Sequence, residues 1–449
     1  MYSKIYYNWR MLLKESKEID DFLDKYQVYS VGGSVRDRLS GLIPHDADYV
    51  VIGANAEDML AAGFQQVGKD FPVFIHPETK EEYALPRTET KTGEGHKGFS
   101  FNVGDVSLDQ DLGRRDLTIN AMAQQMRPGG EFGDIVDPYK GREDLKNKVL
   151  RHVSPAFAED PLRVLRVARF SAKFPDFTIA EETKNLMREL VQNGEVGKLT
   201  PERVWLETEK ALSTKDPAKY FEALQETSAL NVWFPEVAKL VGVPQPAKYH
   251  GSLDAWQHTL EAVRSAARKT HDPEVIWAAL CHDLGKGATD PALYPKHYGH
   301  DKAGVALVTA LCDRLVVPNN FRDLAVMSAE FHMNMHRITE MKKSTVVEYL
   351  YKTDAFRKSD RFNKLLQVCE ADATGHAGSD WQREYAEARG WQIALDTAKK
   401  VSPQKYVEMG LKGEQIRDRL KQDRVAAVKQ ALEGFTIPKP PHFGQSGKV

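Results

Sequence analysis

The stretch VGGSVRDRLSGLIPHDADYVVIG, residues 31–53, joins a glycine pair, an arginine and two alternating aspartates to an apolar run. The run, residues 49–52, predicts a β-strand. Because side chains alternate along a strand, we expect Asp46 and Asp48 on the same side of the sheet. Two like charges held so close repel each other, so the pair predicts a bound cation.

The glycine pair Gly32-Gly33 follows a short apolar run and precedes a predicted helix that begins near Ser34. Backbone amides in such a turn can bind phosphate, and glycine allows its close approach. Arg36, one turn into the helix, can add a charge-assisted contact. Carboxylate oxygens suit Mg²⁺, and two such ions can activate a 3′-hydroxyl and stabilise a leaving pyrophosphate. A glycine pair or a DxD alone is typical of a turn or cap, but this order and spacing favour nucleotidyl transfer.

Length and composition limit the class of protein. A chain of 449 residues with 41% hydrophobic residues predicts several globular domains. The net charge of −2 excludes a global basic field, so any nucleic-acid binding depends on local basic patches. Three widely spaced cysteines are typical of a reducing compartment, and no run of apolar residues is long enough to span a membrane. These features predict a cytoplasmic protein.

The hydrophobic periodicity changes along the chain. Residues 1–27 read as a charged helix, and 28–136 as mixed α/β with a helix at 54–63. From about residue 142 the period is helical, which predicts an α/β head followed by an all-α remainder. The predicted strands are 28–31, 49–52, 71–75 and 82–85.

Two further segments place charges beside apolar residues. DLGRRDLTINAM, residues 111–122, reads as a capped helix start with a charge cluster. In EDPLRVLRVARF, residues 159–170, a proline after an aspartate favours a helix start, and arginines recur every third residue among apolar ones. Buried arginines need acceptors, so this stripe faces either a cleft that holds a nucleotide or the solvent.

Histidines and aspartates recur at intervals in the helical part. The ordered series is His258, the adjacent pair His282-Asp283, His300, His332 and Asp372. A single helical histidine is typical of packing, whereas an ordered series over successive helices predicts a metal site. Imidazole with carboxylate suits a transition metal or Mg²⁺.

Together GGSVRD, DAD, RRDLTINAM, DPYKGREDL (137–145) and EDPLRVLRVARF resemble the motifs of class II tRNA nucleotidyltransferases, closest to the bacterial multifunctional CCA-adding enzymes. The resemblance covers residues 28 to about 435. It implies an α+β fold in which a polymerase-β-like head precedes an all-α neck, an HD-type helical body and a helical tail. The implied domains are an N-terminal extension (1–27), head (28–141), neck (142–225), HD phosphohydrolase domain (226–375) and tRNA-binding tail (376–449).

The resemblance also implies roles for single residues of the head and neck. Asp46 and Asp48 would hold catalytic Mg²⁺, and Asp160 with Arg163 would read the incoming base as a protein template. A carboxylate and an arginine can match the donor and acceptor pattern shared by cytosine and adenine, and they leave guanine or uracil with unpaired groups. The residues implied to contact the bound nucleotide are Gly33, Arg36, Arg115, Arg166 and Arg169.

The histidine series resembles the HD phosphohydrolases. It implies metal-dependent phosphatase and 2′,3′-cyclic phosphodiesterase activity, with Ni²⁺, another divalent transition metal or Mg²⁺ as the ion. The implied ligands are His258, His282, Asp283 and Asp372, with His300 and His332 as further ligands or phosphate contacts. One departure is His376, at a position where the family leads us to expect arginine.

The predicted function is template-independent addition and repair of the tRNA 3′-terminal CCA from CTP and ATP, by a monomer or a homodimer. Two alternatives stay open: an enzyme that adds only CC or only A, or makes poly(A), and a phosphohydrolase whose head merely binds RNA. The basic stretches expected to contact tRNA are 337–344, 355–364 and 410–424.

Overall fold

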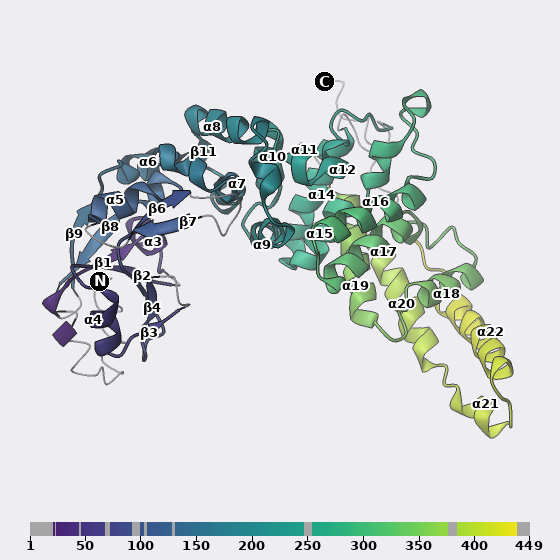
Figure 1. Cartoon of the computed structure of the whole chain (residues 1–449). Helices are drawn as coiled ribbons and strands as arrows, with labels where there is room; N and C mark the ends of the chain where they lie inside the picture. Colours follow the sequence, from purple (N-terminus) through teal and green to yellow (C-terminus); the bar gives the residue numbers. More distant parts are fainter. Residues whose placement is uncertain are drawn as a thin grey trace, which may run out of the picture. The chain divides into compact units, whose positions relative to one another are not determined.

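The computed structural model describes residues 21–437, apart from 23, 45, 68–71, 92–98, 103–105, 128–130, 247–253 and 376–383. The chain forms two compact units, Met1–Leu199 and Thr200–Val449 (Figure 1). Most of the predicted N-terminal helix, 1–27, lies outside the described residues. No described helix is both long and apolar enough to cross a membrane.

A seven-stranded sheet, in the order β3-β4-β5-β2-β1-β8-β9, forms the centre of the N-terminal unit. β1 runs antiparallel to β2 and β8, and β2 runs parallel to β5. The strands are β1 (Gln27–Val31), β2 (Asp48–Ile52), β3 (Gln65–Gln66), β4 (Val73–Ile75), β5 (Glu82–Ala84), β8 (Ala123–Met126) and β9 (Phe132–Val136). A separate ribbon pairs β6 (Thr88–Lys91) with β7 (Phe99–Asn102).

Alternation along β2 divides the core between the two faces of the sheet. Val51 belongs to an apolar cluster with Phe74, whereas Val50 packs in a second cluster with Leu112. Both valines are buried, as a strand in the middle of a sheet requires. The same period places Asp48, the first residue of β2, on the face of Val50.

Two predictions for this unit are wrong in part. The segment 111–122 does not start a helix: it spans the end of α5 and the 3₁₀ turn η1 (Thr118–Asn120) and leads into β8, because its continuation pairs with β1. The segment after 142 is not wholly helical, since β10 (Val149–Leu150) pairs with β11 (Thr178–Ile179). The helices of the unit are α3 (Gly33–Leu39), α4 (Ala56–Ala61), α5 (Leu108–Gly113), α6 (Gly141–Asn147), α7 (Leu162–Lys173) and α8 (Glu181–Gln192).

The C-terminal unit is helical and is built around α15, in which every residue from Val275 to Cys281 is buried. A helix that is apolar on all sides belongs in the centre of a domain, and α15 packs against α14, α17 and α19. The helices are α9 (Pro201–Leu212), α10 (Ala218–Glu226), α11 (Leu230–Trp233), α12 (Pro235–Ala238), α14 (Ala255–Thr270), α15 (Pro273–Cys281), α16 (His300–Arg314), α17 (Asn319–Met335), α18 (Lys343–Lys352), α19 (Ser359–Thr374), α20 (Ala386–Lys400), α21 (Gln404–Glu408) and α22 (Glu414–Ala431).

The 3₁₀ turn η4 (Leu284–Ala288) packs on the start of α16 without room for a side chain at Gly285. A Cβ atom there would overlap the carbonyl oxygen of His300 and lie 2.7 Å from its carbonyl carbon. We expect Gly285→Ala to lower the free energy of unfolding by about 1–3 kcal/mol, measured by urea unfolding. Gly304→Ala in the same contact is the control, because its Cβ would lie at an ordinary 3.4 Å from Ala329 Cβ. Equal destabilisation by both variants would contradict this packing argument.

Candidate active sites

The first site begins at the glycine turn between β1 and α3. Gly32 has φ 72°, a left-handed conformation that glycine adopts without strain, and Gly33 starts the helix as predicted. A Cβ atom at Gly32 would lie 2.8 Å from Nη1 of Arg115. Arg115 thus lies over the turn, and its buried Nε has no hydrogen-bond partner among the described residues.

The two predicted carboxylates lie beside this turn. Asp48 pairs with Val31, the residue just before Gly32, and both Asp46 and Asp48 are exposed. Protein atoms nevertheless surround the Asp48 carboxylate closely enough to raise its pKa; the charge of Asp46 raises it further, and Arg115 lowers it. The donor set is therefore two neighbouring carboxylates beside a glycine turn and an arginine.

Asp116 organises the residues behind the turn. Its buried carboxylate accepts hydrogen bonds from Nε and Nη2 of Arg166 at 2.8 and 2.6 Å, from Nδ2 of Asn120 at 3.0 Å and from the Leu117 amide at 2.8 Å. Burial would raise the pKa of Asp116, but Arg166 and these hydrogen bonds outweigh it and lower the pKa to about 2. Because two nitrogen atoms of Arg166 donate to the same carboxylate, this ion pair fixes Arg166 of α7 against the head.

The guanidinium of Arg36 lies against the glycine turn, where a Cβ atom at Gly33 would be 3.3 Å from its Nη2. Its guanidinium is buried, donates to Oδ1 of Asp37 at 2.8 Å and to Oδ1 of Asn120, and stacks 5.1 Å from the ring centre of Phe174. Since Asn120 also donates to Asp116, a continuous chain of polar contacts runs from α3 to α7.

The start of α7 holds the two residues predicted to read the base. Asp160 accepts from the amide of Leu162, the first residue of α7, at 3.1 Å. Arg163 is buried and donates to the carbonyl oxygens of Arg114 and Ala156 at 2.6 and 2.5 Å. The acceptors that a buried arginine needs are therefore backbone carbonyls.

The stripe of arginines along α7 continues with Arg166 and Arg169. Arg166 is the partner of Asp116, and Arg169 lies over the ring of Phe170 at 4.7 Å. Both side chains are partly exposed, in contrast to Arg163. The stripe therefore passes from a buried end to a partly exposed one.

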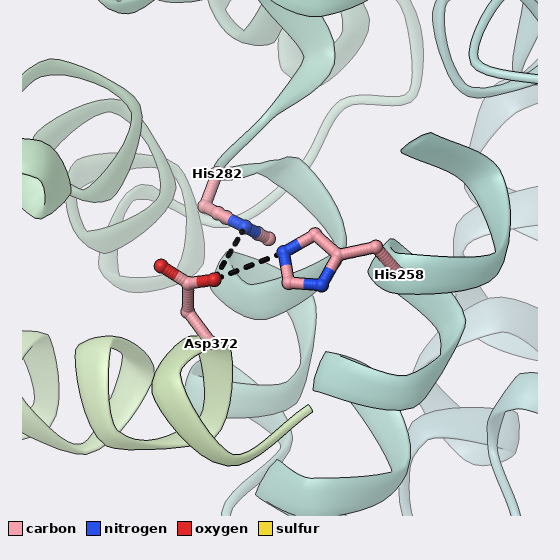
Figure 2. Close-up of side chains that lie close together, drawn as sticks. All are labelled: His258, His282 and Asp372. Carbon is pink, nitrogen blue, oxygen red and sulfur yellow. Dashed lines mark ion pairs between the residues drawn. The ribbon is translucent and has the colours of Figure 1, made fainter. Parts of the chain in front are cut away.

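The second site lies in the C-terminal unit, where the six predicted histidines and aspartates come together. His258 of α14 and His282 at the end of α15 point their Nε2 atoms at Oδ1 of Asp372 of α19, at 2.9 and 3.6 Å (Figure 2). Asp283 lies beside them, with Oδ2 at 3.2 Å from His282 Nε2. These atoms converge from three different helices.

A second group shares Asp283. Its Oδ1 lies 3.4 Å from Nε2 of His300 and 3.5 Å from Nε2 of His332, while its Oδ2 pairs with Nζ of Lys286 at 2.5 Å. The ligand atoms of His258, His282 and Asp372 lie within 4.8 Å of one another, and so do those of Asp283, His300 and His332, as ligands of one ion would. Asp283 thus faces two candidate metal positions.

The other ring nitrogen of each of these histidines faces a backbone carbonyl. Because a carbonyl only accepts, each Nδ1 carries a proton, and the neutral form of each ring presents its Nε2 lone pair to the cluster. This orientation is typical of metal-ligating histidine. The contacts are His258 with Gly375 at 3.2 Å, His282 with Ala279 at 2.7 Å, His300 with His297 at 2.6 Å and His332 with Ser328 at 2.9 Å.

The charges at this cluster call for a cation. Burial lowers the pKa of His282, but Asp283 and Asp372 outweigh burial and raise it to about 10. Nε2 of His282 and of His300 and Oδ1 of Asp283 are buried without a hydrogen bond to any described residue, although oppositely charged atoms lie nearby. A divalent cation would replace the proton on Nε2 of His282 and pair with the carboxylates, so the residues present fit a metal ion.

Three family models match the chain, each over part of its length. The Poly A polymerase head domain matches residues 28–151. The probable RNA and SrmB-binding site of polymerase A matches 176–240, and the HD domain matches 255–374. The glycine turn and the carboxylates of the first site lie in the head match and the second site lies in the HD match, whereas α7 lies between the matched segments.

Solved structures align with nearly the whole chain. A CCA-adding enzyme in an apo form aligns with a TM-score of 0.64 and 21% identity over 93% of each chain. A CCA-adding enzyme with ATP aligns with a TM-score of 0.62 and 19% identity over 97% of this chain and 94% of that one. The Bacillus stearothermophilus CCA-adding enzyme in complex with CTP aligns with a TM-score of 0.61 and 24% identity over 92% of this chain and 91% of that one.

The chain has the fold of the CCA-adding enzymes. The order of head, RNA-binding segment and HD domain confirms the resemblance to class II tRNA nucleotidyltransferases with an HD domain. The predicted α+β class, with a polymerase-β-like head before a helical body, is confirmed as well.

Sequence reasoning missed three residues of the HD-type site. Lys286 pairs with Asp283, and His336 lies with Nε2 at 2.8 Å from Oδ2 of Asp372. Tyr385 contacts His336 in turn. The spacing of His336, four residues after His332 on a predicted helix, places both on one face and is the signal that was available. His376, the departure noted in the sequence, lies outside the described residues.

The Asp116 pair within this CCA-adding fold yields a stability prediction. We expect Asp116→Asn to lower the free energy of unfolding by about 2 kcal/mol at pH 7, because the pKa falls from an ordinary 3.8 to about 2 on folding. A depressed carboxylate pKa stabilises the fold above pH 3.8, and this contribution is lost as the pH falls toward 2. The difference from the unmutated protein should therefore stay constant from about pH 8 to 5 in urea unfolding.

Asp134→Asn is the matched control, because its side chain is 96% exposed and its ion pair with Arg127 is long, at 3.9 Å. We expect it to change the free energy of unfolding by no more than about 0.5 kcal/mol. If the two variants unfold alike, Asp116 does not have the stabilising role assigned to it.

Proposed function

We propose that this chain adds the 3′-terminal CCA of tRNA from CTP and ATP without a nucleic-acid template. The observation that carries the proposal is the pair Asp46 and Asp48 beside the Gly32 turn, with Arg115 over it. Aligned CCA-adding enzymes with ATP and with CTP support these two nucleotides as the substrates.

In this proposal Asp46 and Asp48 hold Mg²⁺, whose preference for oxygen ligands their carboxylates fit. When bound, Mg²⁺ activates the tRNA 3′-hydroxyl and stabilises the leaving pyrophosphate. The amide of Gly33 and the guanidinium of Arg115 bind the nucleotide phosphates, and the buried Nε of Arg115, which has no partner among the residues that the structure describes, supports this role. Arg36, which packs against the turn and donates to Asn120, adds positive charge near the phosphates.

The base is read by Asp160 and Arg163. Two backbone carbonyls fix the plane of the Arg163 guanidinium, and a fixed donor group discriminates between bases better than a mobile one. Arg166, fixed by Asp116, and Arg169 contact the rest of the nucleotide. Cytosine and adenine share a pattern of hydrogen-bond donors and acceptors that Asp160 and Arg163 can match. Guanine and uracil do not, so they leave buried polar groups unpaired.

Removal of both head carboxylates tests the proposal. We expect Asp46→Ala with Asp48→Ala to reduce nucleotide addition to tRNA lacking its 3′ end on the order of a thousandfold or more, since metal stabilisation is worth several kcal/mol. Labelled CTP, labelled ATP and both together are supplied in separate reactions. Stepwise addition of C, C and A that the double variant loses supports the proposal, and unchanged addition would reject it.

The second candidate is partial addition, since enzymes that add only CC or only A use the same head chemistry. The same reactions separate the two, because a partial enzyme extends only tRNA that ends at one stage of the CCA sequence. Incorporation of A alone or C alone would keep the nucleotidyltransferase assignment and replace CCA addition by the partial reaction.

We further propose that the HD-type site is a metal-dependent phosphohydrolase that removes 3′-phosphates and opens 2′,3′-cyclic phosphates at RNA ends, which extends CCA addition to repair. His258, His282, Asp283 and Asp372 would hold a divalent ion such as Ni²⁺ or Mg²⁺. When bound, such an ion supplies an activated water and neutralises phosphate charge. His300 and His332 face the free side of Asp283, as a second ion or the substrate phosphate requires.

A double variant of this site separates the two activities. We expect His258→Ala with Asp372→Ala, or removal of metal by a chelator, to lower phosphate release from 2′,3′-cyclic and 3′-phosphate ends on the order of a thousandfold. Nucleotide addition should stay within about twofold when Mg²⁺ is restored, because these ligands lie in the other unit. The head double variant is the reciprocal control. Loss of both activities in either double variant would contradict two independent sites.

The tRNA is proposed to lie on basic surfaces of the C-terminal unit. Arg337, Arg357 and Arg417, one from each basic stretch, have 62%, 80% and 67% of their side chains exposed. Each of these arginines pairs with an acidic residue near the surface. Such pairs contribute little to stability, so a tRNA phosphate can replace the acidic partner at small cost. The buried free thiols of all three cysteines support a cytoplasmic location.

A further inference from the structure

His336 is bonded differently from the histidines of the metal cluster. It follows the last residue of α17, and its Nε2 lies 2.8 Å from Oδ2 of Asp372. Its Nδ1 faces the hydroxyl of Tyr385 at 2.8 Å, a side chain that is 6% exposed at the start of α20. The three side chains form a line from α20 to α19.

The chemistry of these partners fixes the direction of each hydrogen bond. An ionised carboxylate only accepts, so Nε2 of His336 must donate to Asp372. In a neutral imidazole Nδ1 then accepts, and Tyr385 is its donor. The four histidines of the cluster have the opposite tautomer, because their Nδ1 atoms donate to backbone carbonyls.

The two oxygens of Asp372 therefore have separate partners. Oδ1 faces His258 and His282, whereas Oδ2 is held by His336. With Oδ2 engaged by His336, Asp372 presents Oδ1 toward the cluster. His336 differs from His258 in its Nδ1 partner, a hydroxyl in place of a backbone carbonyl, so we assign it to holding Asp372 and not to the ion.

We infer that Tyr385 and His336 form a positioning relay that orients Asp372 as a one-oxygen metal ligand and connects the start of α20 to the metal site. The inference rests on the metal site proposed above. Groups that orient a ligand typically contribute tenfold to hundredfold in metal affinity, so removing the relay should weaken binding without removing the ion's ligands.

The test titrates the full-length protein, after chelation and dialysis, with Ni²⁺ alone by calorimetry and with Co²⁺ by visible absorption. We expect His336→Ala to weaken binding on the order of tenfold to a hundredfold and to change the Co²⁺ spectrum. Tyr385→Phe should weaken it by less, since only the outer hydrogen bond is lost. His336→Gln should keep affinity close to that of the unmutated protein, because its amide can donate in place of Nε2–H.

Tyr406→Phe is the matched control. Tyr406 is also buried, and its hydroxyl donates to a carboxylate, Oδ2 of Asp423, that lies outside the cluster. Its loss should leave the metal affinity unchanged. Tyr385→Phe removes only one oxygen atom and keeps the ring, so this variant should fold. It therefore tests the relay even if His336→Ala does not fold.

The outcomes separate the relay from the site. If the unmutated protein binds neither ion, the proposed metal site fails and the relay with it. If it binds but His336→Ala and Tyr385→Phe bind equally well, the relay is wrong and the site stands. If His336→Gln is as weak as His336→Ala, His336 acts as a ligand, which also overturns the relay.

Discussion

A charge withdrawn from water must find a counter-charge or several hydrogen bonds, and this requirement determines where the functional side chains of both units lie. Asp116 satisfies it with Arg166, Asn120 and a backbone amide. Arg163 satisfies it with two carbonyl oxygens. The head and α7 are joined by these contacts, so the residues proposed to bind the nucleotide are held in place before any nucleotide arrives.

The local parts of the head could be predicted from sequence. Gly32 and Gly33 predicted a turn and a helix start, and the apolar run after Asp48 predicted a strand; both follow from backbone sterics and period-two burial. The strand β8 could not be predicted in this way. Its residues, which include two glutamines, become a strand because Ala123 pairs with Val31, far away in sequence, and so short a segment carries no periodicity that separates strand from helix.

The metal cluster shows the same division between residue choice and geometry. Six of its members could be selected from sequence, because histidine and aspartate recur in order on successive helices. The direction of their ring nitrogens could not, since it depends on carbonyl groups at helix ends, such as Ala279 for His282. The role of His336 depends on Tyr385, which lies 49 residues further along the chain.

The two sites differ in donor type and exposure for a reason that follows from their proposed chemistry. Asp46 and Asp48 are exposed, and two carboxylates fill only part of the coordination shell of an ion. The remaining positions are left for substrate oxygens, as transfer between a triphosphate and an RNA end requires. In the HD-type site the ring nitrogens of His258 and His282 and the carboxylate of Asp283 are almost completely buried. An ion there is held mainly by the protein, and its properties depend on how rigidly the protein fixes each ligand. A relay behind Asp372 is useful only at a site of this second kind, where the geometry of the ligands is set before the substrate binds.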